Sequence, residues 1–460
     1  MLPKKTPVPE APFVPKKGKT PMLVRGMKDI LPVDWPWWNL VFDKVISVAR
    51  EFGFERIETP VVEENAMFVR SVGKDSDIVE KEMFAFTDRG GDAVALRPEG
   101  TAGVVRAYLE HGMMAMPQPI KLFYISPMFR YDRPQSGRYR QFWQFGFEIL
   151  GDGHPVVDAE VIAIGATIYQ ELGIPVRVQV NSVGDAASRT AYLKVLLEYF
   201  KPRRTRLCEE CKKRLIKNPM RILDCKEPDC QLLAQDAPPF LDHLSEPAKE
   251  HFVKVLEHLD DMDVPYDLNP RIVRGLDYYT HTAFEYTVAD DIGVEKQQSA
   301  LGGGGRYDGL VELFGGRPTP AIGFAGGIER TIMQLKARGI QPPAPLRPDV
   351  FIAQLGDAAR KKSIKLFREL RSLGIRAAAT FSKTSIKAQL ESANRLRAPF
   401  TLILGQKELV DGTILIRDME SGIQEVVDFG KAVGEVKKRV QKTNGEKQLV
   451  NGDVVADIQE

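Results

Sequence analysis

The sequence predicts an α+β protein with an antiparallel sheet core, a helical insertion and a C-terminal α/β domain. Three observations predict this class. Residues 121–150 form a pattern of two long strands joined by a polar loop. Residues 188–265 change to helical periodicity and hold all four cysteines of the chain. After residue 350, short apolar strands alternate with amphipathic helices, which is typical of a compact α/β domain.

The composition bounds the class of protein. A chain of 460 residues has room for about three domains. Its net charge of +2 neither demands nor excludes a nucleic-acid partner. No apolar run is long enough to span a bilayer, and residues 1–21 lack the apolar core of a signal peptide. We therefore expect a cytoplasmic protein without a membrane partner, with a disordered Pro/Lys-rich arm at 1–21 and a disordered tail at 443–460.

The hairpin at 121–150 has two different faces in its second strand. Because side chains alternate along a strand, one face carries Phe142, Gln144, Gly146 and Glu148. The other carries Trp143, Phe145, Phe147 and Ile149, which indicates a core face. The polar face is a candidate floor for a small ligand. The loop beside it supplies cations that suit phosphate: Arg130, Arg133, Arg138 and Arg140. This pairing suggests nucleotide-dependent activation of a small molecule, and an ordinary hairpin with a solvated face is the alternative.

Three further segments could contribute to the same site. Residues 97–101 open a helix, with Thr101 as a possible N-cap. Residues 274–280 form a turn into an antiparallel strand. Residues 301–309 are glycine-rich but lack the Lys-Ser/Thr ending of a P-loop and the parallel βαβ setting of a dinucleotide site. The structural alternative for the glycines is a bulged strand that packs closely against a neighbour.

Together these segments resemble class II aminoacyl-tRNA synthetases, and within them the histidyl-tRNA synthetase family, from Arg25 to about residue 440. Residues 54–73 look like the first class II motif, a dimer-interface element. Residues 129–148 look like the second motif and residues 323–330 like the third. The two histidine-specific signatures are matched at 274–280 and 301–310.

The resemblance implies a domain organisation and a reaction. A class II catalytic domain would occupy 22–345 around six antiparallel strands, with an inserted helical subdomain at about 188–265. An anticodon-binding α/β domain would occupy 348–441. The implied enzyme is a homodimer that uses ATP with Mg²⁺ to activate histidine. It then charges tRNA(His) and releases AMP and pyrophosphate.

The resemblance also implies roles for individual residues. Arg130 and Arg274 would be catalytic, acting on the α-phosphate and the reacting carboxylate. ATP would be bound by Arg130, Arg138 and Arg330. The amino-acid end of histidine would be held by Glu99, Thr101, Gln144 and Arg274. The imidazole would contact Glu148 and Tyr279, with Tyr307 nearby, and Gly146 would leave room for the substrate.

The cysteines carry two interpretations. Cys208 and Cys211 have the spacing of a metal knuckle, and Cys225 and Cys230 follow with four residues between them. The second half is longer than usual and is stiffened by Pro228. We expect reduced thiols in a helical insert and no metal ligands, with a structural zinc site as the alternative.

Two other functions compete with the enzyme. One is a non-catalytic regulatory paralogue that serves histidine biosynthesis, which would lack the anticodon domain and lose signature residues. The other is the tRNA-sensing region of a stress kinase, which would need an attached kinase domain. Arg130, Arg274, Arg330 and the region 348–440 are all present, which favours the enzyme.

Overall fold

The computed structural model describes residues 20–74, 76–132, 137–273, 276, 278–290, 300–344 and 346–441. Arg274, Arg133, the tail predicted at 443–460 and the predicted arm up to residue 19 lie outside this part of the chain. The chain divides into two compact units between Pro343 and Ala344. Among the described helices, none is both long and apolar enough to cross a membrane.

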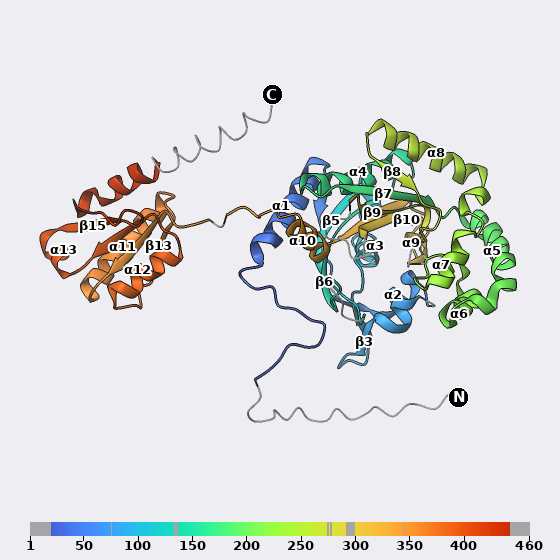
Figure 1. The fold of residues 1–460 in the computed structure, drawn as a ribbon, viewed down its shortest axis with the longest axis horizontal. Coiled ribbons are helices and arrows are strands. Elements are labelled where there is room, and N and C mark those ends of the chain that lie inside the picture. Colours follow the sequence, from blue (N-terminus) through green and yellow to red (C-terminus); the bar gives the residue numbers. More distant parts are fainter. Residues whose placement is uncertain are drawn as a thin grey trace. The chain divides into compact units, whose positions relative to one another are not determined.

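An eight-stranded sheet forms the centre of the N-terminal unit (Figure 1). In sheet order its strands are β1 (Glu55–Arg56), β5 (Ile120–Phe129), β6 (Gln141–Leu150), β11 (Ala321–Gly327), β10 (Ala300–Arg306), β9 (Thr280–Val288), β7 (Val176–Ser182) and β8 (Tyr266–Leu268). The six strands from β5 to β7 pair antiparallel, as predicted. Two short edge strands, β1 and β8, extend this sheet by parallel pairing and were not counted in the prediction.

The two faces of β6 serve different purposes, as the alternation predicts. Phe145, Phe147 and Ile149 are fully buried in the main core. Trp143 also points to this side, where its ring lies 5.9 Å from that of Trp38. Four helices contribute to this core: α1 (Trp35–Glu51), α4 (Pro155–Glu171), α8 (Glu246–Asp261) and α10 (Ile328–Ala337). The opposite face packs against α3 (Thr101–Glu110) and the short α9 (Leu310–Leu313).

The buried guanidinium of Arg97 joins three segments at the edge of the sheet. It is 2% exposed. It donates to the Thr59 carbonyl at 2.6 Å, to the Pro127 carbonyl at 2.9 Å and to the Glu58 carboxylate at 2.9 Å. Beside it lies a small sheet with α2 (Asn65–Val72) packed on it; its strands are β2 (Val62–Glu64), β4 (Ala93–Leu96) and β3 (Phe84–Thr87). Arg97 thus fixes the segment after β1 and the start of α3 relative to β5.

The glycine-rich segment is a bulged strand, as its structural alternative predicts. β10 lies between β9 and β11, with a register shift near each end of its pairing with β9. A Cβ on Gly304 would lie only 2.0 Å from the Gly323 carbonyl oxygen of β11, so no larger residue fits there. At the end of the strand, Arg306 forms an ion pair with the fully buried Asp158 of α4.

Residues 186–261 are helical. Their elements are α5 (Ala186–Phe200), the 3₁₀ turn η3 (Lys201–Arg206), α6 (Glu209–Lys217), the 3₁₀ turn η4 (Pro219–Ile222), α7 (Pro228–Gln235), the 3₁₀ turn η5 (Phe240–His243) and α8. The elements from α5 to η5 share a core of their own, which includes Tyr192, Phe200 and Phe240. α8 packs against α4 instead and so belongs to the main core.

The C-terminal unit is a five-stranded mixed sheet with helices. Its elements are β12 (Val350–Gln354), α11 (Asp357–Ser372), β13 (Ala377–Ala379), α12 (Ile386–Arg395), β14 (Phe400–Leu404), α13 (Gln406–Asp411), β15 (Thr413–Asp418) and β16 (Gln424–Asp428), followed by helical residues 432–441. The strand order is β13-β12-β14-β15-β16. The alternation in the sequence predicts all of these except the short α13.

The Arg306–Asp158 pair gives a prediction for stability. Burial alone would raise the pKa of Asp158, but Arg306 and His251 lower it to about 2, so the carboxylate is ionised at neutral pH. Arg306→Met leaves this buried charge with much less compensation. We expect it to lower the free energy of unfolding of the N-terminal unit by about 3–5 kcal/mol, measured by urea titration at pH 7. The control is Arg306→Met combined with Asp158→Asn, which should recover part of the loss. A double variant less stable than Arg306→Met would contradict this explanation.

Candidate active site

A pocket of about 480 Å³ lies over the polar face of β6. It brings together segments that are far apart in the sequence: the start of α3, the hairpin of β5 and β6, residues 278–285, β10 and the start of α10. Seven of the predicted site residues line it: Glu99, Thr101, Arg130, Arg138, Gln144, Tyr279 and Arg330. The remaining described ones, Glu148 and Tyr307, do not line it: Glu148 accepts a hydrogen bond from the Thr101 hydroxyl, and Tyr307 donates to Glu148.

Four of the described arginines line this pocket, and three of them, Arg130, Arg138 and Arg330, are predicted ATP-binding residues. Arg130 donates to the Pro98 carbonyl at 2.8 Å and lies 5.4 Å from the centre of the Phe142 ring. Arg330, at the start of α10, donates to the Ala300 carbonyl at 2.8 Å. Burial lowers the pKa of Arg330, and the positive charges of Arg138 and Arg130 lower it further. Cations that repel one another in a shared cavity favour a multiply charged anion such as a polyphosphate.

The carboxyl group of Glu148 connects three parts of the pocket floor. Tyr307 donates to its Oε2 at 2.6 Å and Thr101 donates to its Oε1 at 2.8 Å. The residue is only 1% exposed. Burial raises the pKa of Glu148 to about 8, against the two hydrogen bonds, which lower it. At neutral pH this group is therefore mostly a neutral acid, able to donate or accept a proton within the pocket.

Glu99 directly precedes Gly100, the N-cap residue of helix α3, and its side chain binds amides of the first turn. Its two carboxylate oxygens accept hydrogen bonds from the backbone N–H groups of Thr101 at 2.6 Å and Ala102 at 2.9 Å. The expectation that Thr101 is the N-cap is therefore wrong: Thr101 is the first helical residue, and its hydroxyl bonds Glu148 instead. Burial raises the pKa of Glu99, while the helix amides lower it. Each oxygen keeps a second lone pair, so a cation in the pocket can still be bound.

Tyr124 fills the space beside Gly146. A Cβ on Gly146 would lie 2.2 Å from Cζ of Tyr124, and one on Gly100 would lie 2.3 Å from the same atom. The expectation that Gly146 leaves room for substrate is therefore wrong, because the neighbouring strand β5 places this ring there. Tyr124 itself lines the pocket. Gly100 and Gly146 lie on either side of the Tyr124 ring. Neither glycine shows from the sequence that Tyr124 is the residue that packs there.

Further lining residues were not predicted from the sequence. Tyr278 lies with its ring centre 4.7 Å from that of Tyr279 and 5.7 Å from that of Tyr307. Glu285 and Glu329 add carboxyl groups, and Arg221 comes from the helical insertion. Tyr278 and Glu329 lie within the recognised segments 274–280 and 323–330, but the pattern gives them no role. Glu285 and Arg221 lie outside the recognised segments.

Comparison with protein families agrees with this arrangement. The family described as histidyl-tRNA synthetase matches residues 26–190 and 219–331. The family described as anticodon binding domain matches residues 349–439, which lie in the C-terminal unit. The first match includes every predicted site residue, and it omits residues 191–218 of the helical insertion.

Individual proteins show the same likeness over nearly the whole chain. A histidine–tRNA ligase of Dehalococcoides mccartyi is 48% identical over 417 residues, which are 90% of this chain and 99% of that protein. One of Pelotomaculum thermopropionicum is 48% identical over 425 residues, 92% of this chain and 98% of that protein. The crystal structure of apo histidyl-tRNA synthetase from S. aureus superposes with a TM-score of 0.76 at 38% identity, covering 91% of this chain and all of that one. The chain belongs to the histidyl-tRNA synthetase family.

Proposed function

We propose that this chain is a histidine–tRNA ligase. It activates histidine with ATP to give histidyl-adenylate and pyrophosphate, and then transfers the histidyl group to the 3′ end of tRNA(His), releasing AMP. One observation carries this proposal: the buried Glu148 carboxyl group is bonded to Thr101 and Tyr307 next to a pocket lined by the three predicted ATP-binding arginines. In a member of this family, we expect such a pocket to bind the imidazole of histidine next to the triphosphate of ATP.

The activation step follows from the charges of the pocket. The histidine carboxylate is already ionised and attacks the α-phosphate without a general base. The difficulty is the negative charge at phosphorus in the transition state, which fixed cations stabilise. In this proposal Arg130 binds the α-phosphate, and Arg138 and Arg330 bind the remaining phosphates. Arg274, outside the described residues, contacts the carboxylate and the α-phosphate, as the family motif implies.

The proposed histidine site uses carboxyl, amide and hydroxyl groups instead of the arginines that would bind ATP. Glu99, Gln144 and Thr101 hold the α-ammonium group, and Glu148 and Tyr279 bind the imidazole. Tyr307 orients the Glu148 carboxyl group. An apolar competitor would leave these buried groups without partners, so discrimination of about ten thousandfold or more is reachable without an editing step.

Mg²⁺ would bind together with the ATP phosphates. This ion prefers carboxylate and phosphate oxygens and usually takes only one or two protein ligands. Glu285 lines the same pocket as Arg330 and supplies a carboxylate there. We assign Glu285 as the protein ligand, where the ion would neutralise phosphate charge.

The other partners follow from the domain organisation. Residues 348–441 would bind the tRNA anticodon, in line with the family match at 349–439. A homodimer would form through residues 54–73, where Val61 and Val62 are exposed although apolar. We expect the enzyme to act in the cytoplasm. The non-catalytic regulatory paralogue is the weaker candidate, because the pocket arginines and the anticodon-binding region are both present.

Charging of tRNA tests the whole proposal. With [¹⁴C]histidine, ATP and a tRNA(His) transcript, the purified chain should form acid-precipitable histidyl-tRNA. A tRNA with another anticodon and acceptor end serves as the control and should stay uncharged. Formation of no histidyl-tRNA by folded protein would contradict the proposal and favour the regulatory paralogue.

The pKa of Glu148 predicts the pH dependence of histidine activation. In this proposal the Glu148 carboxyl group and the histidine imidazole share one proton. Histidine should therefore bind best at a pH between about 6.5, the pKa of a free imidazole, and about 8, the pKa of Glu148. Above pH 8 both groups are deprotonated, and kcat/KM for histidine should fall about tenfold per pH unit. Glu148→Gln should lower kcat/KM at pH 7.5 and abolish this limb. If the Glu148→Gln variant keeps the same alkaline limb, another group must titrate.

Arg330 gives a prediction for ATP. Arg330→Met should lower kcat/KM for ATP about a hundred- to a thousandfold in ATP–pyrophosphate exchange, because a fixed cation at the polyphosphate is lost. Lys336→Met is the matched control, since Lys336 lies on the same helix and pairs with Asp34 instead. Equal activity of the two variants would rule out the role of Arg330.

A further inference from the structure

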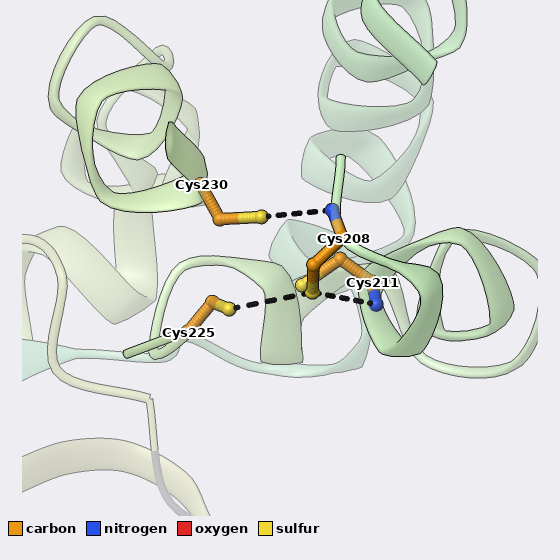
Figure 2. A group of neighbouring side chains, drawn as sticks. All are labelled: Cys208, Cys211, Cys225 and Cys230. Atoms are coloured by element: carbon orange, nitrogen blue, oxygen red, sulfur yellow. Dashed lines mark hydrogen bonds between the residues drawn. The ribbon is translucent and has the colours of Figure 1, made fainter. Parts of the chain in front are cut away.

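The four cysteines of the chain converge on one point of the helical insertion (Figure 2). Cys208 is the N-cap of α6 and Cys211 lies in its first turn. Cys225 follows the turn η4, and Cys230 lies in α7. The Sγ atoms of all four lie within 4.8 Å of one another. The long spacing between Cys225 and Cys230 does not separate them, because the chain turns between η4 and α7.

The distances between the sulfur atoms identify the kind of site. A tetrahedral ion with Zn–S bonds of about 2.3 Å holds its sulfur ligands about 3.8 Å apart. The Sγ atoms of Cys208 and Cys225 are 3.9 Å apart. A disulfide would need about 2.05 Å. In an iron–sulfur cubane the thiolates bind different irons and lie farther apart than around one ion. The separation therefore fits a single tetrahedral metal ion.

Three of the four cysteines are buried, and Cys208 is partly exposed. Cys211 and Cys230 are fully buried and Cys225 is 7% exposed, within the core shared by α5, α6 and α7. Backbone N–H groups point at two of the sulfur atoms: that of Cys208 at Sγ of Cys230, 3.3 Å away, and that of Cys211 at Sγ of Cys208, 3.4 Å away. Such N–H groups stabilise thiolates, the form of cysteine that binds metal.

We propose that Cys208, Cys211, Cys225 and Cys230 bind one structural Zn²⁺ ion as four thiolates. Thiolate ligands in a tetrahedron select zinc over the oxygen-preferring Mg²⁺ of the ATP site. Four protein ligands leave no open position, so the role of the ion is to stabilise the fold and not to catalyse. The ion would link three short elements to one another: α6, the turn that follows η4, and α7.

The net charge of such a site is compensated by the protein. Four thiolates and one Zn²⁺ carry a charge of −2. Arg214 lies in α6 three residues after Cys211, so the two side chains are neighbours on the helix surface. Arg214 also donates to the carboxylate of Asp77 at 2.9 Å, so the cysteine cluster and the main unit share one cation.

The zinc site has a structural connection to the pocket. Helix α6 contacts the π-helical turn η1 (Ile78–Glu82) and its N-cap Asp77 through ion pairs. Besides Arg214–Asp77, these include Lys81–Glu210 at 3.1 Å and Lys217–Glu80 at 2.5 Å. Asp77 and Arg221, which flank this contact, both line the pocket. Zinc would thus hold one wall of the candidate active site in place through α6.

Metal analysis of the unmodified protein tests the proposal independently of any activity. Untagged chain, purified under reducing conditions and dialysed against EDTA, should contain one zinc per chain by inductively coupled plasma mass spectrometry. Because the chain has only four cysteines, mercurial titration should release this zinc as four thiols react. Reconstitution with Co²⁺ should give the visible bands and thiolate charge-transfer absorption of a tetrahedral tetrathiolate. Protein that takes up neither ion, contains iron, or has fewer than four thiols after mild reduction would overturn the assignment.

Variants locate the ion. Cys225→Ser and Cys230→Ser should each lose zinc and lower the melting temperature, while the exposed neighbour Gln231 provides the matched control Gln231→Ser, which should keep one zinc per chain. Cysteine variants that retain a full zinc complement would place the ion elsewhere and refute the site. If zinc is confirmed but the wild-type chain fails to charge tRNA, the zinc site stands and only the proposed function fails.

Discussion

The Glu148 carboxyl group is the contact on which the candidate site depends. It joins β6 to Thr101 of α3 and to Tyr307 after β10, three segments that meet only through the fold. Burial raises the pKa of this group to about 8, and in the proposed function it shares a proton with the bound imidazole. Without it the Tyr307 hydroxyl would lose its partner, and the proposed imidazole site would lose its ionisable group.

Much of the fold follows from local patterns in the sequence. Period-two alternation at 142–149 correctly predicts which side of β6 is core, since burying Phe145 and Phe147 requires the opposite face to carry Gln144 and Glu148. The close approach at Gly304 confirms the bulged strand. The identity of the ligands rests instead on resemblance, because glycine spacing and scattered arginines alone do not specify a nucleotide or an amino acid.

The two errors have different physical causes. At Thr101 the cause is local, because Glu99, two residues earlier, turns its carboxylate onto two backbone amides of the helix. At Gly146 the cause is long-range packing, because the neighbouring strand β5 brings Tyr124 into the gap. The convergence of Cys225 and Cys230 on Cys208 likewise depends on how α6 and α7 pack. Spacing along the chain cannot report such contacts.

The most direct measurement is ATP–pyrophosphate exchange without tRNA, run separately with each of the twenty amino acids. A pocket that joins three arginines to the buried Glu148 carboxyl group should support exchange with histidine and not with the other nineteen. Exchange with a different amino acid would contradict the imidazole site. Absence of exchange with any of them, from folded protein supplied with Mg²⁺, would contradict the activation chemistry itself.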